Sequence, residues 1–185
     1  MIKVSKTKLK GVLQISPDVF KDRRGEFVET YNKELYNGLI ARYIEHSARY
    51  RKKGINIKFV QDDISVSKKN VLRGIHADSK AWKLVSCIFG KIYMVIVNCD
   101  ENSKDFGKWQ SFILSDENKM QILVPPKHGN AFLVLSKEAI FTYKQSEYYN
   151  PKRQSTYKWN DSRFKIKWPV KNPILSERDK SGRYS

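Results

Sequence analysis

The 185-residue sequence has only two cysteines, Cys87 and Cys99, and they do not form a CxxC pair. This scarcity does not fit a disulfide-stabilised fold or a thiolate metal site, and we expect both thiols in a reduced core. Long apolar runs are missing as well. The longest, Ile92–Val97, is far too short to cross a bilayer, and Met1–Gly11 lacks the continuous apolar stretch of a signal peptide. These absences predict a cytoplasmic protein with no membrane partner.

Histidines and acidic residues are also scarce. The three histidines, His46, His76 and His128, are isolated and form no HxH pattern, so a histidine metal site is not indicated. Lysine and arginine number 36 against 19 acidic residues, which gives a formal net charge of +17. Such an excess suits nucleic acid, an anionic membrane or a phosphorylated ligand. Because the lysines are spread from Lys3 to Lys180, most of this charge is expected on a solvated surface.

Short runs with β-strand character fill most of the chain and are separated by turn signals. Asn32–Tyr50 is the one segment with a helical pattern. KLVSCIF and KIYMVIVNC are expected to form a tight hairpin at Phe89–Lys91, around Gly90. Hydrophobic residues make up 40% of the chain, enough to bury a core, and no linker divides it. We therefore expect a single all-β domain over residues 1–185, either a sandwich or a small barrel.

Residues 59 to 67, FVQDDISVS, alternate between the two faces of a strand. One face carries Gln61, Asp63, Ser65 and Ser67 and is mostly polar, whereas the other is mostly apolar. A solvent-exposed face in this lysine-rich chain should carry lysine, and the polar face carries none. The pattern favours the lining of a cavity that binds a polar ligand.

Asn70–Val85, NVLRGIHADSKAWKLV, places charged groups within a strand-forming run. An unpaired buried charge is costly, so Arg73, His76 and Lys83 should meet a partner or a ligand. Arg73 and His76 are three positions apart and would point to opposite faces of a regular strand. Gly74 between them can supply a bulge that turns both side chains the same way.

Other motifs lie before and after this stretch, and together they form an ordered set along the chain. From about Phe20 to about Asp179 the chain reads FKDRRGEFVETY, RGIH, KLV, FGKW, LSDENKMQ, YKQSEYYNP, KWND, KWP and ILSERD. RGxH alone is a weak signal, but the ordered set is specific and covers most of the chain. The set resembles the dTDP-4-dehydrorhamnose 3,5-epimerase family, which implies a cupin-type β-barrel (jelly roll) with short peripheral helices.

The resemblance implies a cofactor-independent, metal-independent epimerase of nucleotide-diphosphate 4-keto-6-deoxy sugars, used in making surface-polysaccharide sugars. Inverting the carbons that flank the ketone needs a base, a cation at the ketone oxygen and an acid on the opposite face. By motif match, His76 is the base and Asp161 of KWND orients its imidazole. Lys83 stabilises the enolate and Tyr143 is the acid.

The same resemblance implies a substrate-binding set and a homodimer. Arg73 would hold the diphosphate or the sugar. The N-terminal segment of the family reaches across a dimer, so its residues can serve the neighbouring site. The other binding residues implied are Gln61, Asp63, Asn130, Phe20, Arg24, Phe27, Glu29, Tyr148 and Tyr149.

Departures from the family pattern leave the substrate open. The family's second histidine falls on Asn130, His128 has no assigned role, Asp63 stands where an asparagine is usual, and residues 42–58 are longer than in typical members. Epimerisation at one position, a keto-isomerase, or a GDP-linked heptose substrate are alternatives. From another class, a non-catalytic basic β-barrel that binds nucleic acid would use the same charge. Taken singly, Asp161 can also cap a turn.

Overall fold

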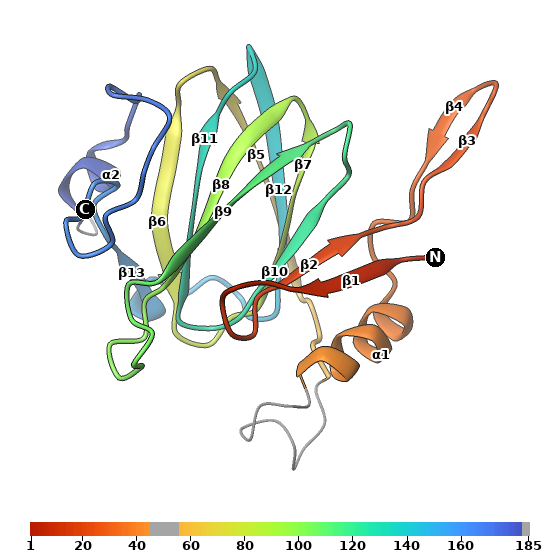
Figure 1. Ribbon diagram of the computed structural model, residues 1–185, viewed down its shortest axis with the longest axis horizontal. Helices are drawn as coiled ribbons and strands as arrows, with labels where there is room; N and C mark the ends of the chain where they lie inside the picture. Colours follow the sequence, from red (N-terminus) through yellow and green to blue (C-terminus); the bar gives the residue numbers. More distant parts are fainter. Residues whose placement is uncertain (45–55, 183–185) are drawn as a thin grey trace.

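Two β-sheets face each other and form the body of the protein (Figure 1). The computed structural model describes residues 1–44 and 56–182. One sheet has the strand order β1-β2-β10-β7-β12-β5 and the other has the order β13-β6-β11-β8-β9. Strands adjacent in the sheets are distant in sequence in most pairs, as in a jelly roll. The prediction of an all-β, cupin-type jelly roll with short peripheral helices is confirmed.

The strand bounds place these sheets on the sequence. In the first sheet they are β1 (Lys3–Lys6), β2 (Leu13–Ser16), β10 (Gln121–Val124), β7 (Lys83–Phe89), β12 (Glu138–Gln145) and β5 (Gln61–Lys68). In the second they are β13 (Gln154–Thr156), β6 (Leu72–Asp78), β11 (His128–Val134), β8 (Lys91–Asn98) and β9 (Trp109–Ser115). The remaining elements are the hairpin β3 (Phe20–Asp22) and β4 (Gly25–Phe27), the helices α1 (Lys33–Ile44) and α2 (Glu177–Ser181), and a 3₁₀ turn at Pro151–Arg153.

Strand β8 explains the longest apolar run of the sequence. Met94 and Ile96 belong to the core cluster between the two sheets. Val95 and Val97 point the other way and pack in a second cluster with Phe164 of the C-terminal segment. Because both faces of the strand are covered, it reads as a continuous hydrophobic run and not as an alternating one.

The expected hairpin at Phe89–Lys91 is not formed. Strand β7 pairs with β10 and β12, whereas β8 pairs with β9 and β11, so the chain crosses from one sheet to the other at this point. Gly90 has a φ of 75°, and a Cβ built there would lie 2.2 Å from the carbonyl oxygen of Glu138. The glycine thus marks a tight corner between sheets, which has the same local sequence signal as a hairpin turn.

Helix α1 confirms the helical prediction as far as Ile44, and the rest of the segment up to Tyr50 lies outside the described residues. The helix buries Tyr36 and Ile40 against Leu13 and other apolar residues at one end of the first sheet. In Figure 1 the β3–β4 hairpin extends away from the two sheets.

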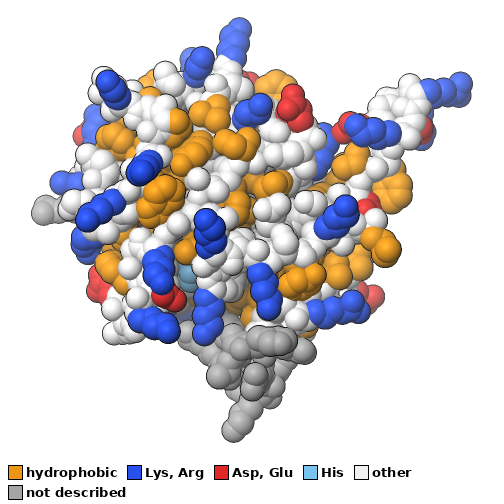
Figure 2. All heavy atoms as spheres, in the orientation of Figure 1, with side chains coloured by type: hydrophobic (Ala, Val, Ile, Leu, Met, Phe, Trp, Pro, Cys, Tyr) orange, Lys and Arg blue, Asp and Glu red, His pale blue; other side chains and the backbone are white. Residues whose placement is uncertain are grey.

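The positive charge is dispersed on the face of the molecule that Figure 2 shows. Figure 2 shows Lys and Arg side chains spread over the face in view and separated by hydrophobic and uncharged groups. Among residues 1–44 and 56–182, neither helix is long and apolar enough to span a membrane.

Candidate active site

A cavity of about 370 Å³ lies between the two sheets and the C-terminal segment. Both sheets contribute polar side chains to its wall. Of the residues expected from sequence, those that line it are Asp63, Arg73, His76, Lys83, Asn130, Tyr143 and Tyr149. Ser65, on the polar strand face that was predicted to line a cavity, lines it as well, and the polar lining residues that sequence reasoning did not assign are Gln145, Gln154, Ser176, Arg178 and Asp179.

Strand β6 supplies Arg73 and His76 through a bulge. Asn130 pairs with His76 and Phe132 with Arg73, so Ala131 alone faces two residues of β6. Gly74 has a φ of 119°, and a Cβ built there would be 2.5 Å from that of Ala131. Both Arg73 and His76 therefore line the cavity, as the position of Gly74 predicted.

The carboxylate that contacts His76 is that of Asp179. His76 Nε2 and Asp179 Oδ1 are 2.7 Å apart, and only 4% of the aspartate side chain is exposed. Ser176 caps helix α2 by accepting from the backbone N–H of Asp179, which fixes the aspartate in the first turn. A neutral imidazole that donates from Nε2 keeps Nδ1 unprotonated and able to accept a proton.

The environment favours neutral His76 and ionised Asp179. Burial lowers the pKa of His76, although the adjacent Asp179 carboxylate opposes this shift. Burial alone would raise the pKa of Asp179, but the hydrogen bond and charge of His76 and the hydrogen bonds from Ser176 and Gly74 bring it below its ordinary value. A neutral imidazole held by a carboxylate is suited to act as a general base.

The predicted pairing of His76 with Asp161 is wrong. The Asp161 carboxylate accepts hydrogen bonds from Arg163, at 3.0 Å from Nε and 2.7 Å from Nη2. Arg163 also lies against the rings of Tyr157 and Phe164. Asp161 thus stabilises a local turn. The signal that would have found Asp179 is the Ser-x-x-Asp pattern of ILSERD, which marks the start of a helix.

Lys83 is buried on β7 and faces Asn130 and Tyr143. Its Nζ donates to Asn130 Oδ1 at 3.3 Å and lies 5.6 Å from the centre of the Tyr143 ring. Burial lowers the pKa of Lys83 to about 8, although the negative charge of Asp78 opposes this effect. A buried ammonium in the cavity wall can stabilise a negative charge that develops beside it.

Tyr143 lies directly across from Asp63 in the β12–β5 pairing. Burial, followed by the charge and hydrogen bond of Asp63, raises the pKa of Tyr143 to about 12. Gln61 lies behind the cavity wall. Its Nε2 donates to both oxygens of Asp63, at 3.1 and 3.0 Å, and its Oε1 accepts from the backbone N–H of Tyr149 at 2.9 Å.

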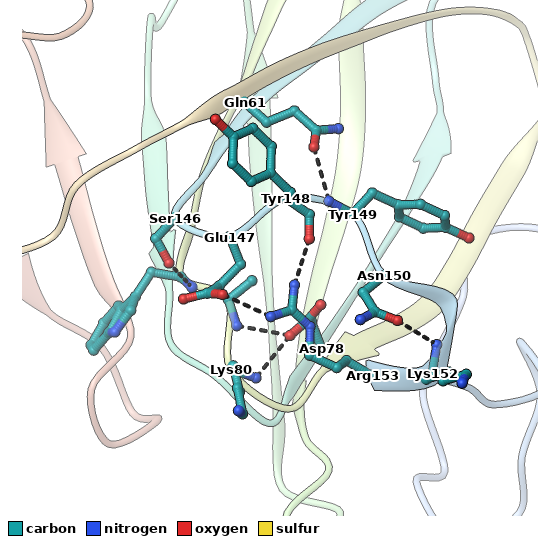
Figure 3. Close-up of polar contacts among 12 residues, drawn as sticks. Gln61, Asp78, Lys80, Ser146, Glu147, Tyr148, Tyr149, Asn150, Lys152 and Arg153 are labelled. Carbon is teal, nitrogen blue, oxygen red and sulfur yellow. Dashed lines mark hydrogen bonds and ion pairs between the residues drawn. The ribbon is translucent and has the colours of Figure 1, made fainter.

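Tyr148 and Tyr149 follow β12 and point in different directions. Figure 3 shows their rings on opposite sides of the backbone, with Gln61 bonded to Tyr149. Tyr149 lines the cavity, whereas Tyr148 is 73% exposed. The Tyr148 carbonyl accepts from Arg153, which also donates to Glu147.

Asp78 anchors the loop between His76 and Lys83. Its Oδ1 accepts from the backbone N–H groups of Lys80 and Ala81 at 2.8 Å, and its Oδ2 accepts from Gln154 (Figure 3 shows the loop contacts). Since Gln154 lines the cavity, this buried carboxylate joins the loop to the wall of the site.

The four expected binding residues of the N-terminal segment lie outside this cavity. Phe20 and Phe27 of the β3–β4 hairpin are 61% and 69% exposed. Arg24 forms an ion pair with Asp22 within the same hairpin at 2.6 Å. Glu29 follows the hairpin and is exposed. None of the four contributes to the cavity wall of its own chain.

Two lining groups have unsatisfied hydrogen-bonding capacity. Ser65 Oγ and Gln145 Nε2 are buried and find no partner among the described residues. His128 Nε2 has the same property, but His128 does not line the cavity, and its Nδ1 lies 3.3 Å from the carbonyl oxygen of Pro126. In the part of the chain that the structure describes, no three His, Cys, Asp or Glu side chains are grouped as metal ligands.

A jelly roll whose cavity combines a carboxylate-held histidine, a buried lysine and a protonated tyrosine defines an acid–base enzyme. The family model described as dTDP-4-dehydrorhamnose 3,5-epimerase matches residues 6–184. The enzymes of that description from Shigella flexneri and Salmonella typhimurium are 38% and 39% identical, with 97% of this chain and 93% of each relative covered. The chain belongs to the dTDP-4-dehydrorhamnose 3,5-epimerase family and is a cofactor-independent epimerase.

Solved structures agree with this family assignment. The Legionella pneumophila dTDP-6-deoxy-D-glucose-3,5-epimerase, in complex with dTDP-4-keto-L-rhamnose, has a TM-score of 0.87 and 34% identity, covering 98% of this chain and 92% of that one. The Elizabethkingia anophelis dTDP-4-dehydrorhamnose 3,5-epimerase has a TM-score of 0.84 and 40% identity, covering 98% and 94%.

Proposed function

We propose that this epimerase acts on a dTDP-linked 4-keto-6-deoxy hexose and inverts both carbons that flank the ketone. The observation that carries this proposal is the contact of His76 with buried Asp179 in a cavity that also holds Lys83 and Tyr143. The family model and the curated relatives are described as dTDP-4-dehydrorhamnose 3,5-epimerases, which supports this proposal over the one-position, heptose and nucleic-acid alternatives. The free, buried cysteines accord with the reducing cytoplasm as the site of action.

His76 is the base in this proposal. Its Nδ1 removes the proton from a carbon next to the ketone, and the charge of the resulting imidazolium is balanced by Asp179. Lys83 donates to the ketone oxygen, where negative charge develops as the enolate forms. Its depressed pKa, about 8, leaves a proton available for this hydrogen bond near neutral pH.

Tyr143 is the acid that returns a proton to the opposite face of the carbon. The phenol is protonated at neutral pH because its pKa is raised to about 12. After it has given its proton to the enolate, Tyr143 is a phenolate and His76 is an imidazolium. His76 must therefore release its proton to solvent and Tyr143 must take one up before the next inversion. Reprotonation by Tyr143 gives inversion, whereas return of the proton by His76 gives the starting sugar.

The remaining lining groups suit a nucleotide sugar. Arg73 and Arg178 offer cationic donors for the diphosphate. Ser65 Oγ and Gln145 Nε2, buried with no partner in the described residues, can bond sugar hydroxyls. Asn130 and Asp63 add an amide and a carboxylate to the same wall, and the Tyr149 ring can stack on the base.

A homodimer completes this proposal. The hairpin residues Phe20, Arg24 and Phe27 are exposed and do not line the cavity of their own chain. In this proposal they contact the substrate in the site of a second copy. An apolar surface is available for such an association on the first sheet, where Val66, Ile140 and Phe89 pair across β5, β12 and β7. Val66 and Phe89 are each about half exposed.

The test is proton NMR of the dTDP-4-keto-6-deoxy sugar in deuterated water. Two carbon-bound protons should be replaced by deuterium as the inverted product forms. Tyr143→Phe should retain exchange while inversion falls by about 10²-fold or more, the scale of a lost general acid. Exchange at one position alone would overturn the two-position assignment, and inversion at the wild-type rate in Tyr143→Phe would remove Tyr143 as the acid.

A further inference from the structure

Asp63 places a carboxylate in a cavity proposed to bind a diphosphate. It lines the cavity on β5 and is clamped from behind by Gln61, whose Nε2 lies 3.0 Å from one carboxylate oxygen and 3.1 Å from the other. Gln61 is in turn fixed by the backbone of Tyr149. These hydrogen bonds fix the orientation of the Asp63 side chain. Its negative charge in the cavity wall needs a hydrogen-bond donor or a cation beside it.

The neighbour in register is Tyr143. The two residues are direct partners in the antiparallel β12–β5 pair, where facing Cβ atoms are about 5 Å apart. Both side chains line the same cavity. Since the Asp63 carboxylate can only accept and the phenol can donate, the pair has one sensible polarity, with Tyr143 donating to Asp63.

We propose that Asp63 is a positioning residue for the Tyr143 phenol: the carboxylate orients the hydroxyl and keeps it protonated until the enolate forms. This role rests on the proposed function of Tyr143 as the acid. It also gives a reason for aspartate at this position, because a neutral amide would not favour the protonated phenol by charge.

Other charged and titratable groups around Tyr143 set the size of the effect. Lys83 on β7 lies 5.6 Å from the ring centre. Arg178 of α2 acts to lower the pKa of Tyr143, and Tyr149 acts to raise it, as do burial and Asp63. Asp63 also favours the charged form of Lys83. Loss of the carboxylate therefore makes both Tyr143 and Lys83 easier to deprotonate.

The experiment follows the Tyr143 phenol directly in Asp63→Asn. Protein labelled with ¹³C at tyrosine Cζ is titrated by NMR, and the Tyr143 signal is identified by its absence from Tyr143→Phe. Asparagine has the same shape and can still accept from Gln61. The Tyr143 signal should begin to shift at a pH about one unit lower than in the wild type, the scale of a nearby charge. Asp63→Glu should largely restore the wild-type titration.

Asp62→Asn is the matched control. Asp62 is the preceding residue on the same strand, faces outward and pairs with Lys144, so this variant removes the same charge from the opposite face and should leave the Tyr143 signal unchanged. The ratio of inversion to solvent exchange should fall about tenfold in Asp63→Asn, less than the 10²-fold loss expected without the acid.

Two outcomes separate this inference from the proposed function. The role of Asp63 is overturned, whatever happens to activity, if the Tyr143 titration is unchanged in Asp63→Asn or shifts equally in Asp62→Asn. A raised KM with an unchanged titration would identify Asp63 as a substrate contact instead. If the titration shifts as expected but Tyr143→Phe still inverts the sugar normally, the pairing of Asp63 with Tyr143 stands and the acid assignment fails.

Discussion

The C-terminal segment contains two carboxylates with different roles, those of Asp179 and Asp161. Only Asp179 contacts His76, and Asp161 is held by Arg163. Removing the charge of Asp179 without changing its shape should disturb the histidine tautomer and leave the imidazolium unbalanced.

We predict that Asp179→Asn lowers the rate of solvent exchange beside the ketone by about 10²-fold or more. Asp161→Asn is the control and should keep near wild-type exchange, since its effect is confined to the turn around Arg163. Deuterium incorporation measured by NMR at saturating substrate compares the two. Equal losses in both variants would contradict the assignment of Asp179.

The pH dependence of kcat/KM should reflect His76 and Lys83. The base must be neutral, and because burial lowers the pKa of His76, the acid limb should lie below the usual histidine value. Lys83 must be charged, and with a pKa of about 8 the activity should fall as pH rises through that value.

Asp78→Asn should move this alkaline limb to lower pH, because Asp78 is the carboxylate that most favours charged Lys83. The exposed Asp105, paired with Lys108, offers a control variant, Asp105→Asn, that should leave the profile unchanged. An alkaline limb that stays in place in Asp78→Asn would show that another group controls it.

For individual residues, the sequence predicted the cavity lining well where the residues lie close together in one motif. Arg73, His76 and Lys83 fall within one short stretch, and a bulge at Gly74 was enough to bring the first two together. The partner of His76 could not be obtained that way, because Asp179 is 103 residues further along the chain. A carboxylate of a different motif, Asp161, matched the role equally well by sequence alone.

Among the elements, strand β6 depends most on a single glycine. Gly74→Ala would combine a left-handed backbone position with a Cβ that meets Ala131 at 2.5 Å. We predict a loss of about 3–5 kcal/mol in the free energy of unfolding, from backbone strain and overpacking together. Urea denaturation followed by fluorescence measures it.

Gly25→Ala is the control for the strain alone. Gly25 in the β3–β4 hairpin has a φ of 130° and nothing within 4 Å of its virtual Cβ. Its cost should therefore be nearer 1–2 kcal/mol. Equal losses for the two variants would mean that the contact with Ala131 relaxes without cost.

The sequence predicted some features of the strands correctly and others wrongly. The polar face of β5 was predicted to line a cavity, and two of its four residues, Asp63 and Ser65, do so, whereas Gln61 and Ser67 are not part of the cavity wall. The corner at Gly90 was predicted wrongly because turn residues report a change of direction but not the sheet that receives the next strand. Sheet membership depends on pairings such as β12 with β5, which no local pattern specifies.

For the whole molecule, the exposed apolar face of the first sheet leads to a prediction about assembly. Ile64 on β5 is 68% exposed beside the half-exposed Val66. Sedimentation equilibrium should give twice the 21.7 kDa chain mass for the wild type, and Val66→Lys, which does not alter the cavity wall, should shift the protein toward monomer by placing charge in the interface.

Ile113→Lys provides the comparison, since Ile113 is exposed on β9 of the other sheet. It should remain dimeric. The monomeric Val66→Lys should also bind the nucleotide sugar more weakly, because the hairpin residues would no longer reach a neighbouring site. A wild-type protein that is monomeric and fully active would refute the shared site.

The long separation between His76 and Asp179 also bears on how the protein folds. Most sheet pairs join segments far apart in the chain, such as β10 with β2 and β12 with β5. Folds dominated by such non-local pairings fold slowly, on the scale of milliseconds to seconds, because long loops must close first. His76, the proposed base, can contact the carboxylate of Asp179 only after the sheets have closed and α2 has docked on β6. If His76 is the base, partly folded chains lack the pair of His76 and Asp179, and catalytic activity then reports completion of folding and not merely collapse of the core.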